Sequence, residues 1–140
     1  MGGPKTLPPY PIDIDALPHI SGIIISHDHY DHLDKSTIKK IHTKVGGFYV
    51  PLGVGQHLLD WGVPSDKIHE FDWWQQKQVG DITLVNTPAH HFSGRSLTDG
   101  NTTLWSSWVI KTPQHRLFLA VTLAIFLDLK ILVINTGLLI

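Results

Sequence analysis

Five candidate metal ligands fall within the six-residue stretch His27-Asp28-His29-Tyr30-Asp31-His32. An apolar run, Gly22-Ile23-Ile24-Ile25-Ser26, comes directly before it and predicts a buried strand that ends where the ligands begin. A strand that delivers imidazoles and carboxylates into a loop is a common way to build a metal site. Because neutral imidazole and carboxylate oxygen both suit zinc, the sequence predicts a zinc site in this loop.

Composition limits the classes of protein to which the chain can belong. A length of 140 residues predicts one domain, and a hydrophobic fraction of 42% with five Trp is enough for a core. A net charge of −1 argues against a nucleic-acid-binding surface, and the lack of Cys restricts metal ligands to nitrogen and oxygen. Residues 1–20 contain no apolar signal segment, and Asp128 and Lys130 interrupt the apolar tail. We therefore expect a cytoplasmic protein without a transmembrane helix.

Helices and strands are expected to alternate along the chain. Asp34 is a suitable N-cap for a helix that runs to His42 and places Ile38 and Ile41 on its apolar face. The other expected elements are a helix at 55–61 ended by Gly62, strands at 48–51, 67–71, 82–86 and 102–110, and turns at 79–81 and 99–101. This alternation predicts an α/β fold.

The strand expected at 82–86 leads to a second pair of candidate ligands, His90 and His91. The chemistry of the two residues leaves open which one joins the first ligands. The remaining histidines have no ligand spacing around them and are expected to be surface or capped residues: His19, His42, His57, His69 and His115. Trp73-Trp74 and Trp105 to Trp108 offer a candidate lipid-contacting surface, although alternating aromatic residues in strands usually belong to the core.

The loop has the spacing H-x-H-x-D-H, which resembles the metal-binding motif of the metallo-β-lactamase fold superfamily. Two further segments, 87–95 and 103–110, resemble one branch of it, the N-acyl-phosphatidylethanolamine-hydrolysing phospholipase D family and its bacterial relatives. The resemblance covers about residues 2–118. It implies a four-layer αββα sandwich, of which this chain would form a part, and a zinc-dependent hydrolase that cleaves phosphodiesters.

The resemblance also implies a role for each candidate ligand. His27, His29 and His91 would bind the first of two zinc ions, with His91 matching the histidine of the family motif. Asp31 and His32 would belong to the second ion, and Asp31 would be the catalytic residue that orients the attacking water or accepts its proton. The implied substrate is a phospholipid of the N-acyl-phosphatidylethanolamine type, or another phosphodiester. Contact with a membrane would then be peripheral.

The chain departs from this family after about Phe118. The family has a metal-bridging Asp in the next segment, whereas residues 119–125 contain no carboxylate, and a later ligand histidine is also missing. Back-translation of residues 119–125 permits a second reading frame that encodes Ser-Gly-Asp-Thr-Gly-Tyr, which resembles the family. We therefore expect an incomplete domain at 1–118, a frameshifted tail at 119–140, a chain truncated at both ends, about one zinc and impaired activity.

Two alternatives stay open at this level. The motif H-x-H-x-D-H does not fix the substrate, so a lactonase or another hydrolase of the same fold is compatible with the sequence. A chain that lacks part of the second site can also be an inactive metal-binding fragment. Metal content and hydrolysis of a generic phosphodiester separate these possibilities.

Overall fold

The computed structural model describes residues 13–121. The helices are α1 (Lys35–Ile41) and α2 (Val54–Asp60), with single turns of 3-10 helix at η1 (His42–Lys44) and η2 (Ser65–Lys67). The strands are β1 (Ile23–Ile24), β2 (Phe48–Pro51), β3 (Ile68–Phe71), β4 (Gln76–Val79), β5 (Ile82–Thr87), β6 (Ser107–Lys111) and β7 (Arg116–Leu119).

The first three strands form a parallel sheet in the order β1-β2-β3. Phe48 of β2 is in register with Ile23 of β1 and with Ile68 of β3. Parallel neighbours need long crossover connections, and the segments that contain α1 and α2 provide them. All three strands therefore end at the same edge of the sheet, and the loop that follows β1 lies at that edge.

The last four strands form an antiparallel sheet in the order β4-β5-β6-β7. Val79 pairs with Ile82 across the turn between β4 and β5, and Thr87 at the end of β5 pairs with Ser107 at the start of β6. The chain leaves β5 at Thr87 and reaches His91 four residues later. Each sheet thus leads into one of the two histidine-bearing loops.

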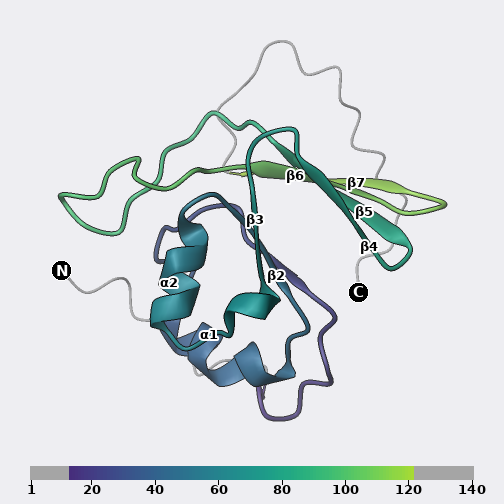
Figure 1. Cartoon of the computed structure of the whole chain (residues 1–140), viewed down its shortest axis with the longest axis horizontal. Coiled ribbons are helices and arrows are strands. Elements are labelled where there is room, and N and C mark those ends of the chain that lie inside the picture. The colour runs from purple at the N-terminus through teal and green to yellow at the C-terminus, as the bar shows by residue number, and fades with distance from the viewer. Residues whose placement is uncertain (1–12, 122–140) are drawn as a thin grey trace.

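The two sheets and the helices form three layers. Figure 1 shows α1 and α2 on one side of β2 and β3, and the antiparallel sheet on the other side. Strand β2 is buried throughout because both of its faces are covered. Its Phe48 and Val50 belong to one buried cluster with Leu58 of α2, whereas Tyr49 belongs to a second cluster with Trp108 of the opposite sheet. The prediction of an α/β fold that forms part of an αββα sandwich is confirmed.

The two predicted helices are present with nearly the expected ends. Asp34 caps α1, because its carboxylate accepts a hydrogen bond from the Thr37 N–H at 2.7 Å. Ile38 and Ile41 are buried, as expected. Gly62 follows α2 with a φ of +96°, a left-handed conformation that favours glycine after a helix.

Two predictions about the antiparallel sheet were wrong. Strand β4 was missed because Gln76-Lys77-Gln78 is polar and exposed, so the turn at 79–81 joins β4 to β5 and not β3 to β5. The predicted hairpin turn at 99–101 has no strands beside it, since β6 begins only at Ser107. Residues before β6 instead bind other loops: the Leu104 N–H donates to Leu52 O and the Ser106 N–H to Ser26 O, both at 2.8 Å.

The predicted boundary between a domain at 1–118 and a tail at 119–140 falls within β7, which ends at Leu119. Val121 is buried, and its N–H donates to Ser107 Oγ at 3.2 Å. The rest of the predicted frameshifted tail, residues 122–140, lies outside the described residues, so the boundary stays a prediction. Within residues 13–121, no helix has the length and hydropathy needed to cross a membrane.

Candidate metal centre

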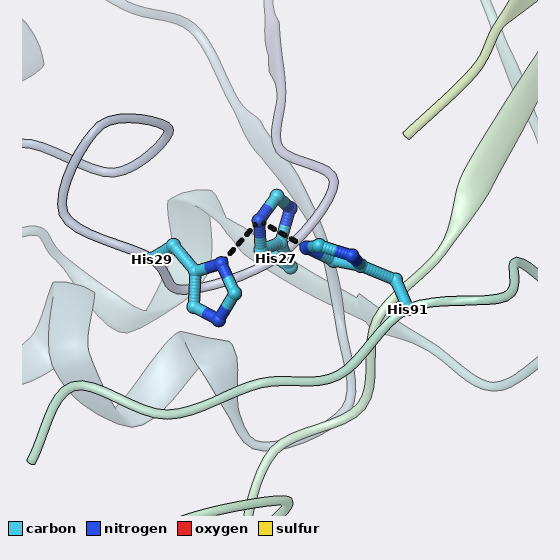
Figure 2. A group of neighbouring side chains, drawn as sticks. All are labelled: His27, His29 and His91. Carbon is cyan, nitrogen blue, oxygen red and sulfur yellow. Dashed lines mark hydrogen bonds between the residues drawn. The ribbon is translucent and has the colours of Figure 1, made fainter. Parts of the chain in front are cut away.

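His27, His29 and His91 come together to form the three-histidine cluster (Figure 2). His27 Nε2 lies 3.0 Å from His29 Nδ1 and 2.9 Å from His91 Nε2. One ring nitrogen from each residue can be chosen so that all three lie within 4.8 Å of one another. His27 is fully buried, and the other two are half-buried, so the cluster opens toward solvent on one side.

The donor set of this cluster fits a metal ion better than it fits a hydrogen-bond network. A ring nitrogen carries either one N–H or one lone pair. His27 Nε2 therefore makes only one full hydrogen bond, although ring nitrogens of both His29 and His91 lie within 3.0 Å of it. A cation placed among the three nitrogens accepts a lone pair from each ring. Three imidazoles with one open position form a ligand set used by catalytic zinc.

Ser26 contacts the other nitrogen of the most buried ring. Its Oγ lies 2.9 Å from His27 Nδ1. In the tautomer in which Nδ1–H donates to this hydroxyl, Nε2 carries the lone pair and faces the cluster. Such a partner on the outer nitrogen is the usual way in which a protein fixes the orientation of a histidine ligand.

Electrostatics keep two of the three rings uncharged at neutral pH. Burial, followed by the proximity of His32, His91 and His29, lowers the pKa of His27 to about 3. Burial and the proximity of His29 also lower the pKa of His91. Because a metal ion binds the neutral imidazole, these shifts reduce competition from protons.

Asp31 and His32 lie beside the cluster and not in it. His32 Nε2 is 3.4 Å from Asp31 Oδ2, and the two side chains are 39% and 76% exposed, respectively. The His32 ring remains close to His27, with 4.4 Å between ring centroids. Among residues 13–121, His27, His29 and His91 form the one group of three or more metal-ligating side chains close enough to share an ion. The roles predicted for Asp31 and His32 stay predictions.

The structure distinguishes His91 from His90, which the residue chemistry alone left open. His91 enters the three-histidine cluster, whereas the His90 side chain is exposed and lies outside it. Among the other histidines, His57 of α2 places its Nε2 3.4 Å from Asp28 Oδ2. This contact with Asp28 could not be expected from the sequence, in which His57 has no ligand spacing around it.

Asp28 is the residue whose placement differs most from the sequence interpretation. It was counted among the five candidate ligands, but its buried carboxylate accepts hydrogen bonds from the Gly94 N–H at 2.8 Å and Thr103 Oγ1 at 3.0 Å. Burial raises the pKa of Asp28, but the contact with His57 and the hydrogen bonds from Gly94 and Thr103 outweigh it and lower the pKa to about 2. No spacing in the sequence signals partners 66 and 75 residues away.

The tryptophans do not form a continuous exposed surface. Trp108 is fully buried between the sheets, where its Nε1–H donates to Ile25 O at 2.9 Å. Trp73 and Trp105 pack edge to face, and Trp73 Nε1–H donates to Trp105 O. Trp74 alone of these four is largely exposed, at 71%. Most of the candidate lipid-contacting surface therefore belongs to the core and its margin.

The α/β fold has one layer of helices and two sheets, and a loop that follows a strand of each sheet contributes to one histidine cluster. These features are those of a metal-binding sandwich domain. The sequence matches the beta-lactamase superfamily domain over residues 1–126. The chain belongs to this family. The resemblance drawn from H-x-H-x-D-H is therefore confirmed at the level of the superfamily.

Individual relatives agree with this assignment. An uncharacterized protein of Mycobacterium tuberculosis is 51% identical over 117 residues, which cover 83% of this chain and 31% of that protein. The N-acyl-phosphatidylethanolamine-hydrolyzing phospholipase D 1 of Caenorhabditis elegans is 33% identical over 126 residues, which cover 83% of this chain and 35% of that enzyme. The chain thus spans about a third of the length of the curated relatives it matches.

A solved structure shares the fold at lower sequence identity. CmlA, a diiron beta-hydroxylase from Streptomyces venezuelae, superposes with a TM-score of 0.61 at 22% identity, over 76% of this chain and 21% of CmlA. This likeness supports the arrangement of the layers.

Proposed function

We propose that this domain is a zinc-dependent hydrolase, a phospholipase D-like phosphodiesterase that acts on lipids of the N-acyl-phosphatidylethanolamine type. The convergence of His27, His29 and His91 carries the proposal. The similarity to the phospholipase D of C. elegans supports the substrate class.

The three-histidine cluster would hold the ion through its inward-facing nitrogens. A zinc ion bound there supplies Lewis acidity to phosphoryl oxygens and lowers the pKa of a nearby water toward ~7. In the proposed reaction the water oxygen bonds to phosphorus while the bond from phosphorus to the alcohol oxygen breaks. The alcohol leaves with a proton, and the phosphate monoester remains.

We assign to Asp31 the role of accepting the proton of the attacking water. It is an exposed carboxylate on the loop that also bears His27 and His29, so it is accessible from the solvent side of the cluster. A carboxylate in this role contributes about 10²–10⁴-fold to a hydrolytic rate. With His32 it would also offer ligands to a second ion. Two ligands hold zinc poorly, so we assign about one zinc to each chain.

Exposed aromatic side chains next to the cluster support a lipid substrate over a fully polar one. Phe92 is 58% exposed, and its ring centroid lies 4.7 Å from that of His29. Tyr30 is 64% exposed on the histidine loop itself. Such side chains offer apolar contacts to an acyl chain whose phosphodiester reaches the cluster.

The test compares three substrates with the zinc-loaded chain: vesicles that contain N-acyl-phosphatidylethanolamine, bis(4-nitrophenyl) phosphate and a simple lactone. We expect hydrolysis of both phosphodiesters, loss of turnover after treatment with a chelator and recovery on addition of zinc. His29→Ala should abolish turnover. His42→Ala changes a histidine outside the cluster and should leave turnover unchanged.

Each contrary result points to a different class of protein. Turnover of the lactone without either phosphodiester would identify another hydrolase of the same superfamily. Tight zinc binding without turnover of any substrate would identify a non-catalytic metal-binding domain.

A further inference from the structure

Asp28 connects the loop that carries His27 and His29 to the loop that follows His91, the third histidine of the cluster. We call residues 27–33 the histidine loop and residues 93–103 the second loop. The Asp28 carboxylate is buried and accepts hydrogen bonds from Gly94 N–H and Thr103 Oγ1, which lie at the two ends of the second loop. One side chain thus fixes both ends of the second loop to the histidine loop.

Arg95 makes the reciprocal connection. Its Nη1 donates to Asp28 O at 2.6 Å and to Leu33 O at 2.7 Å, so it binds the backbone near both ends of the histidine loop. The guanidinium also lies over the rings of Tyr30 and Trp61, at 4.2 and 5.0 Å from the ring centroids. The Tyr30 hydroxyl in turn donates to Arg95 O at 2.6 Å.

The position of His91 depends on these hydrogen bonds between the histidine loop and the second loop. His91 comes three residues before Gly94, and its Nε2 must lie close to His27 Nε2 for the cluster to form. Asp28 stands between His27 and His29 in the chain, so its bonds to the second loop fix the distance between the two parts of the cluster. Zinc–nitrogen distances are about 2.0–2.1 Å, and a displacement of a few tenths of an ångström therefore weakens binding.

We propose that Asp28 and Arg95 are positioning residues that set His91 against His27 and His29, and so determine the affinity and geometry of the bound metal. The proposal rests on the proposed metal site. It assigns Asp28 a function that is different from metal ligation, although it lies within the ligand motif.

Asp34 provides a matched control. Its carboxylate also accepts a backbone N–H and a threonine hydroxyl, at 2.7 and 2.8 Å, but both belong to Thr37 in the first turn of α1. Asp28→Ala and Asp34→Ala both remove hydrogen bonds from a backbone N–H and a threonine hydroxyl, and Asp28→Ala also removes the contact with His57 Nε2 at 3.4 Å. Only the first substitution releases the second loop.

The experiment measures zinc affinity by competition with a chelator and the visible absorption of the cobalt-substituted chain, which reports the coordination geometry. Asp28→Ala and Arg95→Lys should weaken zinc binding by about 10–100-fold and alter the cobalt spectrum, as is usual for partners that orient ligands. Asp28→Asn should recover most of the affinity, because its amide can still accept from Gly94 and pair with the Thr103 hydroxyl. Asp34→Ala should change neither measurement.

A second readout separates this proposal from the metal site itself. In the metal-free chain, Asp28→Ala should shift the imidazole NMR signals of His91, and Asp34→Ala should not. Wild-type zinc affinity and an unchanged His91 signal in both Asp28→Ala and Arg95→Lys would overturn the positioning role while leaving the metal site intact. If the wild-type chain binds no zinc, the metal site is overturned, and the role of Asp28 and Arg95 in metal affinity is overturned with it. A His91 signal that still responds to Asp28→Ala would then show only that the two loops are joined.

Discussion

The histidine loop sends its candidate ligands into two different environments. His27 and His29 meet His91 from the other sheet, and His27 is completely buried there. Asp31 and His32 come later in the same loop, where they pair with each other and their side chains are 76% and 39% exposed, respectively. His91 joins the first group by direct ring contacts, whereas Asp31 and His32 act on His91 through charge. Burial lowers the pKa of His91 most, His32 lowers it further and Asp31 raises it. Convergence of two sheets, and not closeness in sequence alone, therefore creates the three-histidine cluster.

Among the substitutions that test this comparison, His27→Ala should have the largest effect, which is on zinc affinity. It removes the one buried imidazole that contacts both of the others, and two rings hold zinc poorly. Zinc affinity should fall by more than about 100-fold, since even the loss of a partner that only orients a ligand costs about 10–100-fold. Chelator competition measures it, with His42→Ala as the control. Equal losses from the two substitutions would show that the centre lies elsewhere.

Asp31→Asn tests the exposed side of the comparison. Zinc content should stay at about one ion per chain by elemental analysis of the dialysed protein, because the three-histidine cluster is unchanged. Hydrolysis of bis(4-nitrophenyl) phosphate should fall by about 100-fold or more through loss of the proton acceptor. Two tightly held metals in the unchanged chain would contradict the prediction, because other ligands would then complete a second centre with Asp31 and His32.

Acid should destabilise the metal-free chain through the buried ring. The pKa of His27 is about 3 in the folded state and ~6.5 in an unfolded chain, so between these values the unfolded state binds the additional proton. The contribution of the neutral His27 ring to the free energy of unfolding is therefore complete above about pH 6.5 and is lost as the pH falls toward about 3. From about pH 7 to about pH 5 the free energy of unfolding should decrease by about 2 kcal/mol at most. Urea titrations measure it. In His27→Gln the decrease should be smaller, and an equally steep pH dependence would rule out His27 as its source.

The smallest effect is expected from Asp34→Ala, at the N-cap of α1 directly after the histidine loop. Loss of the N-cap should lower the free energy of unfolding by about 1 kcal/mol. Zinc affinity should not change, since the Asp34 carboxylate accepts hydrogen bonds from Ser36 and Thr37 in the first turn of α1 and not from the second loop. Thermal unfolding and chelator competition measure the two quantities on the same sample. A matching fall in zinc affinity would show that helix α1 and the metal centre are coupled.

The elements that could be predicted from sequence are those with local signals. Strand β2 is a continuous apolar run, and α1 has both a capping residue and an apolar face, so each was placed within a residue of its ends. Strand β4 lacks such a signal, because its exposed polar residues are held only by pairing with β5. The turn at 99–101 has the composition of a hairpin, but hydrogen bonds from the neighbouring residues to other loops prevent strand formation.

For the candidate centre, the motif located His27 and His29, and the family resemblance selected His91. The residues that join the loops could not be found in this way. Asp28 has the same side chain as Asp31 and stands in the same motif, yet its partners lie 66 and 75 residues away. Arg95 donates to backbone carbonyls, and because every residue has one, the sequence does not show which carbonyls it binds. Contacts of this kind depend on how the two sheets pack.

The sequence separation of 64 between His27 and His91 also determines when the three-histidine cluster can be completed during translation. At about 5–20 residues per second, a ribosome adds His91 roughly 3–13 s after His27. Until then the nascent chain carries only two of the three imidazoles of the cluster, although by that time the residues of β1 to β5 have already been synthesised. Completion of the three-histidine cluster therefore follows synthesis of β5 and not the appearance of the ligand motif.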